Sequence, residues 1–189
     1  TSLAEPAWTP DGKSIVAVRY YPHSLGPWTR TNRLWLFPID GGAPQELATS
    51  TNTLVYSPSV SPDGRYLYYH SSSMPVIAEG YFKIGTQHQL RRLELATRDD
   101  QVLSETSPRR YYHREPFYAF APAVSPDGKW LAFARRVPGG KTTHGDVTYA
   151  QRTGLWVRNL ESGEERLIVD ALTPDQLETH TMYQIRLLP

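Results

Sequence analysis

The sequence contains no cysteine, which excludes both a disulfide framework and thiol chemistry and leaves the compartment open. No run of about 18 apolar residues occurs, so no membrane-spanning segment is predicted. The 20 basic and 19 acidic residues leave a formal net charge of +1, which gives no long-range field to attract nucleic acid or an anionic membrane. What remains is a chain of 189 residues with 39% hydrophobic content, which is enough for a globular core.

Short catalytic motifs are also missing. The sequence has no Gly-x-Ser-x-Gly elbow, no His-Glu-x-x-His and no glycine-rich phosphate loop. Six histidines are present at spacings that match no metal-ligand pattern. They are His23, His70, His88, His113, His144 and His180. We therefore predict no catalytic residue, no metal ligand and no cofactor in this chain. The alternative is a site that the fold assembles from distant residues, for which His70 and His113 are the histidines to follow.

One turn motif, Ser/Thr-Pro-Asp-Gly-Lys/Arg, occurs three times, at residues 9–13, 61–65 and 125–129. Proline presets φ at the second position, aspartate bonds nearby backbone and glycine relieves crowding at the fourth. The flanking apolar runs are therefore predicted to be antiparallel strands. The turn residues with expected structural roles are Asp11, Gly12, Asp63, Gly64, Asp127 and Gly128. Each aspartate is expected to bond the backbone of its own turn and not to act as an acid, a base or a cation ligand.

A second pair of apolar runs completes each repeat at a constant spacing. Leu34 and Leu47, Leu90 and Leu103, and Leu155 and Ile168 are all the same number of positions apart. Four short strands per repeat make one antiparallel sheet, and repetition of such sheets is typical of β-propeller blades. The predicted fold is all-β: residues 1–189 form a partial β-propeller domain with blades at about 3–48, 56–104 and 121–169, and residues 170–189 begin a further unit.

The second strand of each repeat is apolar on both faces, as a sheet between two neighbours requires. One face carries Ile15, Ala17, Leu67, Tyr69, Leu131 and Phe133, and the other carries Val16, Val18, Tyr66, Tyr68, Trp130 and Ala132. Three blades make an open arc with two bare outer sides, which we expect to include Trp8, Val16, Trp130 and Trp156. Since closed propellers have about four to eight blades, the chain is predicted either to be a fragment of a longer polypeptide or to self-associate as two half-rings in a six-bladed ring.

The repeated turn, followed by a strand of aliphatic and aromatic residues, resembles the TolB-type, WD-like propeller repeat over residues 3–169. That family includes the periplasmic protein TolB and propeller domains attached to prolyl oligopeptidase-like peptidases and some amidohydrolases. The resemblance implies a periplasmic or secreted protein. It also implies either a free-standing propeller or one that gates an attached hydrolase domain and carries no catalytic residue itself.

Loop lengths vary on one side of the predicted arc, in the segments 20–30, 70–89, 109–120 and 138–146. The predicted binding residues on this side are Tyr21, Trp28, Arg109, Arg110, Tyr111, Tyr112, His113 and Arg114. Aromatic and arginine side chains dominate interface energetics, so the predicted partner is a protein, a peptide or an attached domain of the same polypeptide. The alternatives are packing of these rings within the loop layer and a single-stranded nucleic-acid platform; the near-neutral charge argues against nucleic acid.

Overall fold

The computed structural model of the chain describes residues 2–21, 31–48, 53–73, 76–78, 81–83, 88–105, 121–137, 142–144, 147–149 and 152–169. All regular elements in these residues are β-strands, and most of them form three four-stranded antiparallel sheets. The predicted all-β blade architecture is therefore confirmed. We name the sheets blade 1, blade 2 and blade 3 in chain order.

Each blade is built from one continuous part of the chain and runs up and down, strand by strand. Blade 1 contains β1 (Ser2–Trp8), β2 (Ser14–Tyr21), β3 (Thr31–Pro38) and β4 (Gln45–Ala48). Blade 2 contains β5 (Thr53–Val60), β6 (Tyr66–Ser73), β9 (His88–Glu94) and β10 (Asp100–Glu105). Blade 3 contains β11 (Ala123–Val124), β12 (Trp130–Val137), β15 (Arg152–Asn159) and β16 (Glu165–Val169). Two small hairpins, β7 (Val76–Ala78) with β8 (Tyr81–Lys83) and β13 (Thr142–His144) with β14 (Val147–Tyr149), are inserted between the second and third strands of blades 2 and 3.

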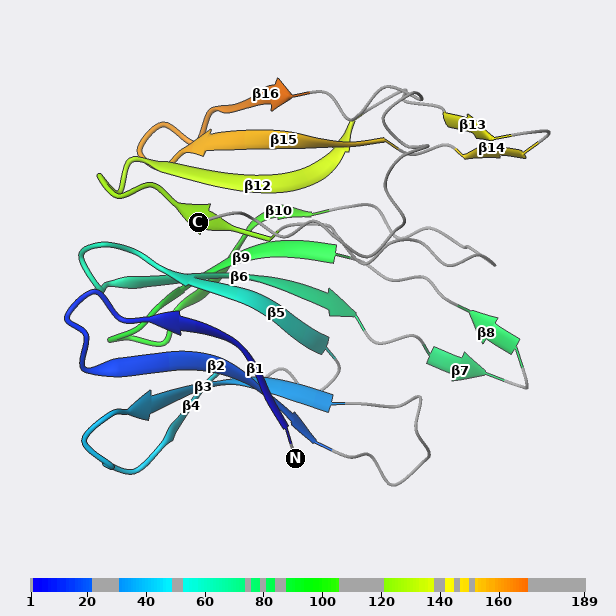
Figure 1. Ribbon diagram of the computed structural model, residues 1–189. Coiled ribbons are helices and arrows are strands. Elements are labelled where there is room, and N and C mark those ends of the chain that lie inside the picture. The colour runs from blue at the N-terminus through cyan, green and yellow to red at the C-terminus, as the bar shows by residue number, and fades with distance from the viewer. Residues whose placement is uncertain are drawn as a thin grey trace.

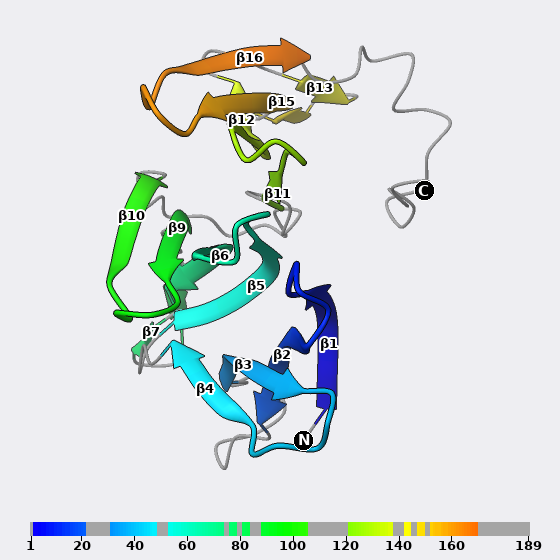
Figure 2. The ribbon, with the colours of Figure 1, turned by 90° about the vertical axis from the view of Figure 1, so that its left-hand side faces the viewer.

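The three blades lie side by side as successive sectors of an arc (Figures 1 and 2). Their first strands, β1, β5 and β11, lie toward the interior of the arc, where β5 contacts both of the others. Their last strands, β4, β10 and β16, lie on the outside. This is the radial arrangement of propeller blades.

The aspartate of each repeated turn bonds to groups within its own turn. In blade 2, Asp63 Oδ1 accepts hydrogen bonds from the Ser61 hydroxyl and, at 3.0 Å, from the Arg65 backbone N–H. Asp11 and Asp127 accept the corresponding two bonds in their turns. Two bonds hold the pKa of each of the three carboxyl groups below the usual value for aspartate. The bond from the turn hydroxyl has the larger effect, and the bond from the backbone N–H has the smaller one.

Replacing Asp127 by alanine is expected to lower the free energy of unfolding slightly, because the Lys129 N–H and the Ser125 hydroxyl lose their acceptor. Denaturant unfolding of the variant beside the wild type measures this difference. The structural role would be contradicted by a calcium-dependent rise in melting temperature that the wild type shows and the variant lacks.

Successive turns also contact one another through the glycine that follows each aspartate. Gly64 has a φ of +71°, which side chains rarely adopt, and a Cβ at this position would lie 3.4 Å from the ring of Pro10 in the preceding turn. Gly128 has the same φ, and its Cβ would lie 3.8 Å from the Pro62 ring. The three turns therefore stack in register along one side of the arc.

Apolar cores fill the two joints between blades. The joint between blades 1 and 2 buries Val16, Val18, Leu34, Leu47, Val55, Leu67, Tyr69 and Leu93. The joint between blades 2 and 3 buries Tyr68, Leu90, Leu131 and Phe133. Burying one such side chain contributes about 1.5–3 kcal/mol. The middle blade thus has both faces covered, which is the arrangement that its doubly apolar second strand predicts.

The prediction for the bare outer sides is right for two residues and wrong for two. Trp8 is 61% exposed, and Trp130 points away from the joint that contains its neighbour Leu131. Val16, in contrast, is fully buried against blade 2, and Trp156 packs on the core between blades 2 and 3. Alternation along a strand shows which residues share a face, but where both faces are apolar it does not show which neighbour that face meets.

Candidate functional site

The two sides of the arc differ in structure. The repeated turns lie on one side, at the left of Figure 1, which we call the turn side. The hairpins β7–β8 and β13–β14 lie on the opposite side, at the right of Figure 1, which we call the loop side. Since loops on a rigid scaffold are where binding residues concentrate, the loop side is the candidate functional site.

Tyr21, at the loop-side end of β2, is the one predicted binding residue within the described parts of the chain. The Arg19 guanidinium lies 5.4 Å from the centroid of the Tyr21 ring and 5.1 Å from that of Trp35. Blade 1 therefore places an arginine beside two aromatic rings near its loop-side end. The other predicted binding residues lie outside the described residues; they are Trp28, Arg109, Arg110, Tyr111, Tyr112, His113 and Arg114.

A pair of histidines links two strands of blade 2 on the loop-side half of the sheet. His70 Nε2 and His88 Nδ1 are 2.9 Å apart, and the two ring centroids are 5.1 Å apart. In the ladder between β6 and β9, His70 lies opposite Leu90 and His88 lies opposite Ser72. The two imidazoles are therefore diagonal neighbours on one face of the blade. Such a bond needs one ring nitrogen to donate and the other to accept.

Burial keeps the His70 side of this pair neutral. The His70 residue is 3% exposed, and the loss of solvation, reinforced by the charge of His88, lowers the pKa of its imidazole to about 3. The Tyr56 ring lies 5.4 Å from the His70 ring, and burial raises the pKa of the Tyr56 phenol. At neutral pH the His70 imidazole and the Tyr56 phenol are therefore uncharged hydrogen-bonding groups.

A carboxylate bridges blades 1 and 2 along the inner strands. Glu5 accepts hydrogen bonds from the Tyr20 hydroxyl at 3.1 Å and from the backbone N–H of Ser57 in blade 2. Burial, reinforced by the charge of Glu5, raises the pKa of Tyr20 to about 12. Glu5 and Ser57 have φ values of 54° and 51° at bulges in β1 and β5. Such left-handed conformations store about 1–3 kcal/mol each and persist where the surroundings hold them.

An asparagine closes the same joint nearer the loops. The buried Asn32 side chain donates to the Val55 carbonyl at 2.8 Å and accepts from the Val55 N–H at 2.7 Å. This two-bond contact replaces the ladder partner that the inner strand β5 lacks on its open edge. Blades 1 and 2 are thus fixed relative to each other on the loop-side half of their joint.

The described residues do not bring together three or more His, Cys, Asp or Glu side chains that could hold a metal ion. The histidine pair alone offers two nitrogen ligands, whereas zinc sites use three or four protein ligands. The described parts of the chain also contain no helix long and apolar enough to cross a membrane.

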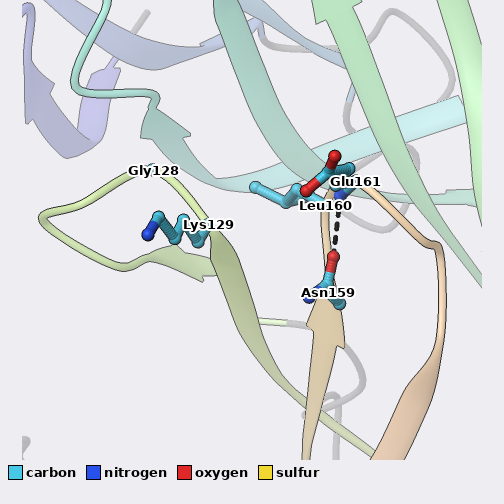
Figure 3. A pocket seen from close by; sticks show the side chains of 5 residues that line it. All are labelled: Gly128, Lys129, Asn159, Leu160 and Glu161. Carbon is cyan, nitrogen blue, oxygen red and sulfur yellow. Dashed lines mark hydrogen bonds between the residues drawn. The ribbon is translucent and has the colours of Figure 1, made fainter.

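A shallow hollow of about 260 Å³ lies on the turn side of blade 3, lined by Gly128, Lys129, Asn159, Leu160 and Glu161 (Figure 3). The Leu160 N–H donates to the Lys129 carbonyl at 2.9 Å, and Asn159 Oδ1 accepts from the Glu161 N–H at 2.9 Å. Leu95 in blade 2 and Ile39 in blade 1 make the same backbone bond between their two turns. The backbone bond beside the hollow is therefore part of the repeated turn design.

The histidine pair and the Glu5 bridge were not predicted from the sequence. The two histidines flank the insertion in blade 2, so a pairing of β6 with β9 would have placed them on adjacent strands. The signal for Glu5 is weaker. Glu5 and Ser57 each precede a proline at the same position of their repeats. This pattern marks the bulges in β1 and β5, but it does not predict the hydrogen bond between the two residues.

No family model matches the chain, and no curated protein sequence matches it. Solved structures do match. The putative TolB from Agrobacterium tumefaciens superposes with a TM-score of 0.56 at 16% identity, over 90% of this chain and 50% of that chain. The Pyrococcus horikoshii acylaminoacyl peptidase superposes with a TM-score of 0.58 at 12% identity, over 88% of this chain and 25% of that chain. The oligogalacturonate lyase from Vibrio parahaemolyticus superposes with a TM-score of 0.53 at 13% identity, over 88% of this chain and 39% of that chain.

These likenesses show the fold, a TolB-like β-propeller, and confirm the resemblance that the repeated turns indicate. At such low identity they carry no activity over to this chain. The chain spans half or less of the length of each of these three proteins.

Proposed function

We propose that this TolB-like propeller arc is a non-catalytic scaffold that binds a protein or peptide through its loop side. The observation that carries the proposal is the contrast between the two sides of the arc. The turn side repeats one design three times, whereas the loop side holds two inserted hairpins, Tyr21 at the end of β2 and the His70–His88 pair. A rigid scaffold with variation confined to one side is the usual form of a binding surface.

The joint between blades 1 and 2 supports this role. The Asn32 bonds to Val55 and the Glu5 bond to Ser57 fix the two blades before any ligand arrives. A surface that is ordered in advance loses little conformational entropy on binding, which favours affinity.

Selection of displayed random peptides against the immobilised chain tests the proposal. Recovered peptides are expected to bind at least about ten-fold more weakly when Tyr21 is replaced by alanine or when residues 74–87 are replaced by a short glycine-serine turn. The matched control replaces Lys129 and Glu161 by alanine on the turn side and should leave affinity unchanged. Peptides that respond to the turn-side change alone would contradict a loop-side binding surface.

A second candidate function is that the arc gates a hydrolase domain in a longer polypeptide. The observation that favours it is the fold likeness to acylaminoacyl peptidase, of which this chain matches 25%. Catalysis would then lie outside this sequence, and the attached domain would be the partner of the loop side. A periplasmic or secreted location is proposed for either function from the TolB-type repeats. The source gene decides between the two, because the second candidate requires a peptidase or amidohydrolase domain encoded in the same reading frame.

A further inference from the structure

Equivalent positions of the three blades differ in exposure at the open end of blade 3. Leu34 and Leu90, on the third strands of blades 1 and 2, are fully buried, whereas Leu155 at the same position of blade 3 is 43% exposed. On the fourth strands, Leu47 is 5% exposed and Ile168, its equivalent, is 48% exposed. Blade 3 therefore presents to solvent the apolar face that blades 1 and 2 cover with the next blade.

Blade 1 presents the matching face at the other end of the arc. In the joint between blades 2 and 3, the Arg135 guanidinium lies 4.1 Å from the Trp156 ring and donates to the Ser104 hydroxyl of blade 2 at 3.1 Å. Arg19 and Trp35 hold the same two positions in blade 1, with the guanidinium 5.1 Å from the ring. Blade 1 thus carries the arginine and tryptophan pair that blade 3 uses to meet its predecessor.

Two details strengthen this equivalence. The indole nitrogens of Trp35 and Trp156 are both buried, and neither has a hydrogen-bond partner among the residues that the structure describes. Val60 in blade 2 and Val124 in blade 3 each pack on the joint with the preceding blade. Trp8, at the corresponding position of blade 1, is 61% exposed. The bare face of blade 1 therefore carries the arginine and tryptophan pair found in the joint between blades 2 and 3. It also carries the exposed Trp8, whose large apolar side chain could pack in such a joint.

We propose that a second copy of this chain covers both bare faces, with blade 3 of each copy packing against blade 1 of the other. Each new joint would repeat the order of the joint between blades 2 and 3, where Leu90 and Leu103 of blade 2 meet the arginine and tryptophan pair of blade 3. Two copies related by a twofold axis bury both faces at once, and the six blades close a ring within the usual range of about four to eight. A second copy is the occupant chosen because the chain itself supplies both halves of the joint.

Light scattering coupled to size exclusion tests the proposal at low micromolar concentration. The wild type is expected to have about twice the chain mass of 21.5 kDa. Leu155→Asp places an unpaired carboxylate in the joint and is expected to weaken association at least ten-fold, toward monomer. The matched control is Val102→Asp, because Val102 is equally exposed at 44% but lies in blade 2, away from both bare faces; this variant should stay dimeric. Circular dichroism of each variant verifies its fold.

Cross-linking identifies the joint itself, since the chain contains no cysteine. The double variant Trp8→Cys with Leu155→Cys is expected to form covalent dimers with a short bis-maleimide, and each single variant is expected to form few. The two positions lie at opposite ends of one arc, so a link within one copy is excluded by distance. A folded wild-type monomer, an open-ended polymer, or a dimer that Val102→Asp weakens as much as Leu155→Asp would each overturn the proposal.

Discussion

Replacing Tyr69 by alanine is expected to lower the free energy of unfolding by about 3–5 kcal/mol, which is a large part of the total for a domain of this size. Tyr69 is 2% exposed and lies in the core between blades 1 and 2. Its hydroxyl donates to Asp100 Oδ2 at 2.7 Å, and the same carboxylate accepts two bonds from Arg91. Alanine would therefore leave both a cavity in the joint and a partly buried carboxylate with one bond fewer.

Denaturant unfolding at constant pH measures this loss. The matched control is Tyr69→Phe, which keeps the ring and removes only the hydroxyl, and for which about 1 kcal/mol is expected. If the alanine variant were destabilised no more than the phenylalanine variant, the joint between blades 1 and 2 would contribute little to stability and the arc would not be held together by its apolar core.

Acid is expected to unfold the protein through His70. The pKa of this imidazole is about 3 in the folded chain, against 6.5 in an exposed histidine, so below pH 6.5 the unfolded chain binds a proton that the folded chain does not. The contribution of neutral His70 to the free energy of unfolding is therefore complete above pH 6.5. It is lost as the pH drops toward 3, by about 1.4 kcal/mol per pH unit. Between pH 6.5 and pH 4 this amounts to about 3 kcal/mol.

The slope of stability against pH isolates this effect from the absolute stability of a variant. His70→Gln removes the titrating group, so its free energy of unfolding should fall less steeply between pH 6.5 and pH 4 than that of the wild type. The turn aspartates titrate at lower pH and remain in both proteins, so they cancel in the comparison. Equal slopes for the two proteins would show that His70 is protonated in the folded state or that acid opens the chain elsewhere.

The sequence predicts the blades well because its signals are local. The proline, aspartate and glycine of each turn act within a few residues, and the constant spacing of the third and fourth strands reflects one repeated hairpin. The orientation of the blades was harder to predict. Val16 and Trp156 were expected on bare faces and lie in joints, because neighbour identity depends on the direction in which the arc turns.

The candidate site was less predictable than the fold for a related reason. Its described contacts join residues that are distant in sequence and meet only when the strand register is known. His70 and His88 are brought together across a 14-residue connection, and Glu5 meets Ser57 across a blade joint. Tyr21 was predicted from its residue type and loop position, which are signals that require no register.

The continuity of each blade in sequence has a consequence for synthesis. Because no strand is borrowed from a later repeat, blade 1 and then blade 2 can form as soon as residues 48 and 105 have left the ribosome. The joint between them then closes while blade 3 is still being made. During that interval Tyr68 and Leu90, which blade 3 will cover, face water. The time needed to translate the third repeat therefore sets how long the nascent chain displays an apolar sheet to other nascent chains and to chaperones.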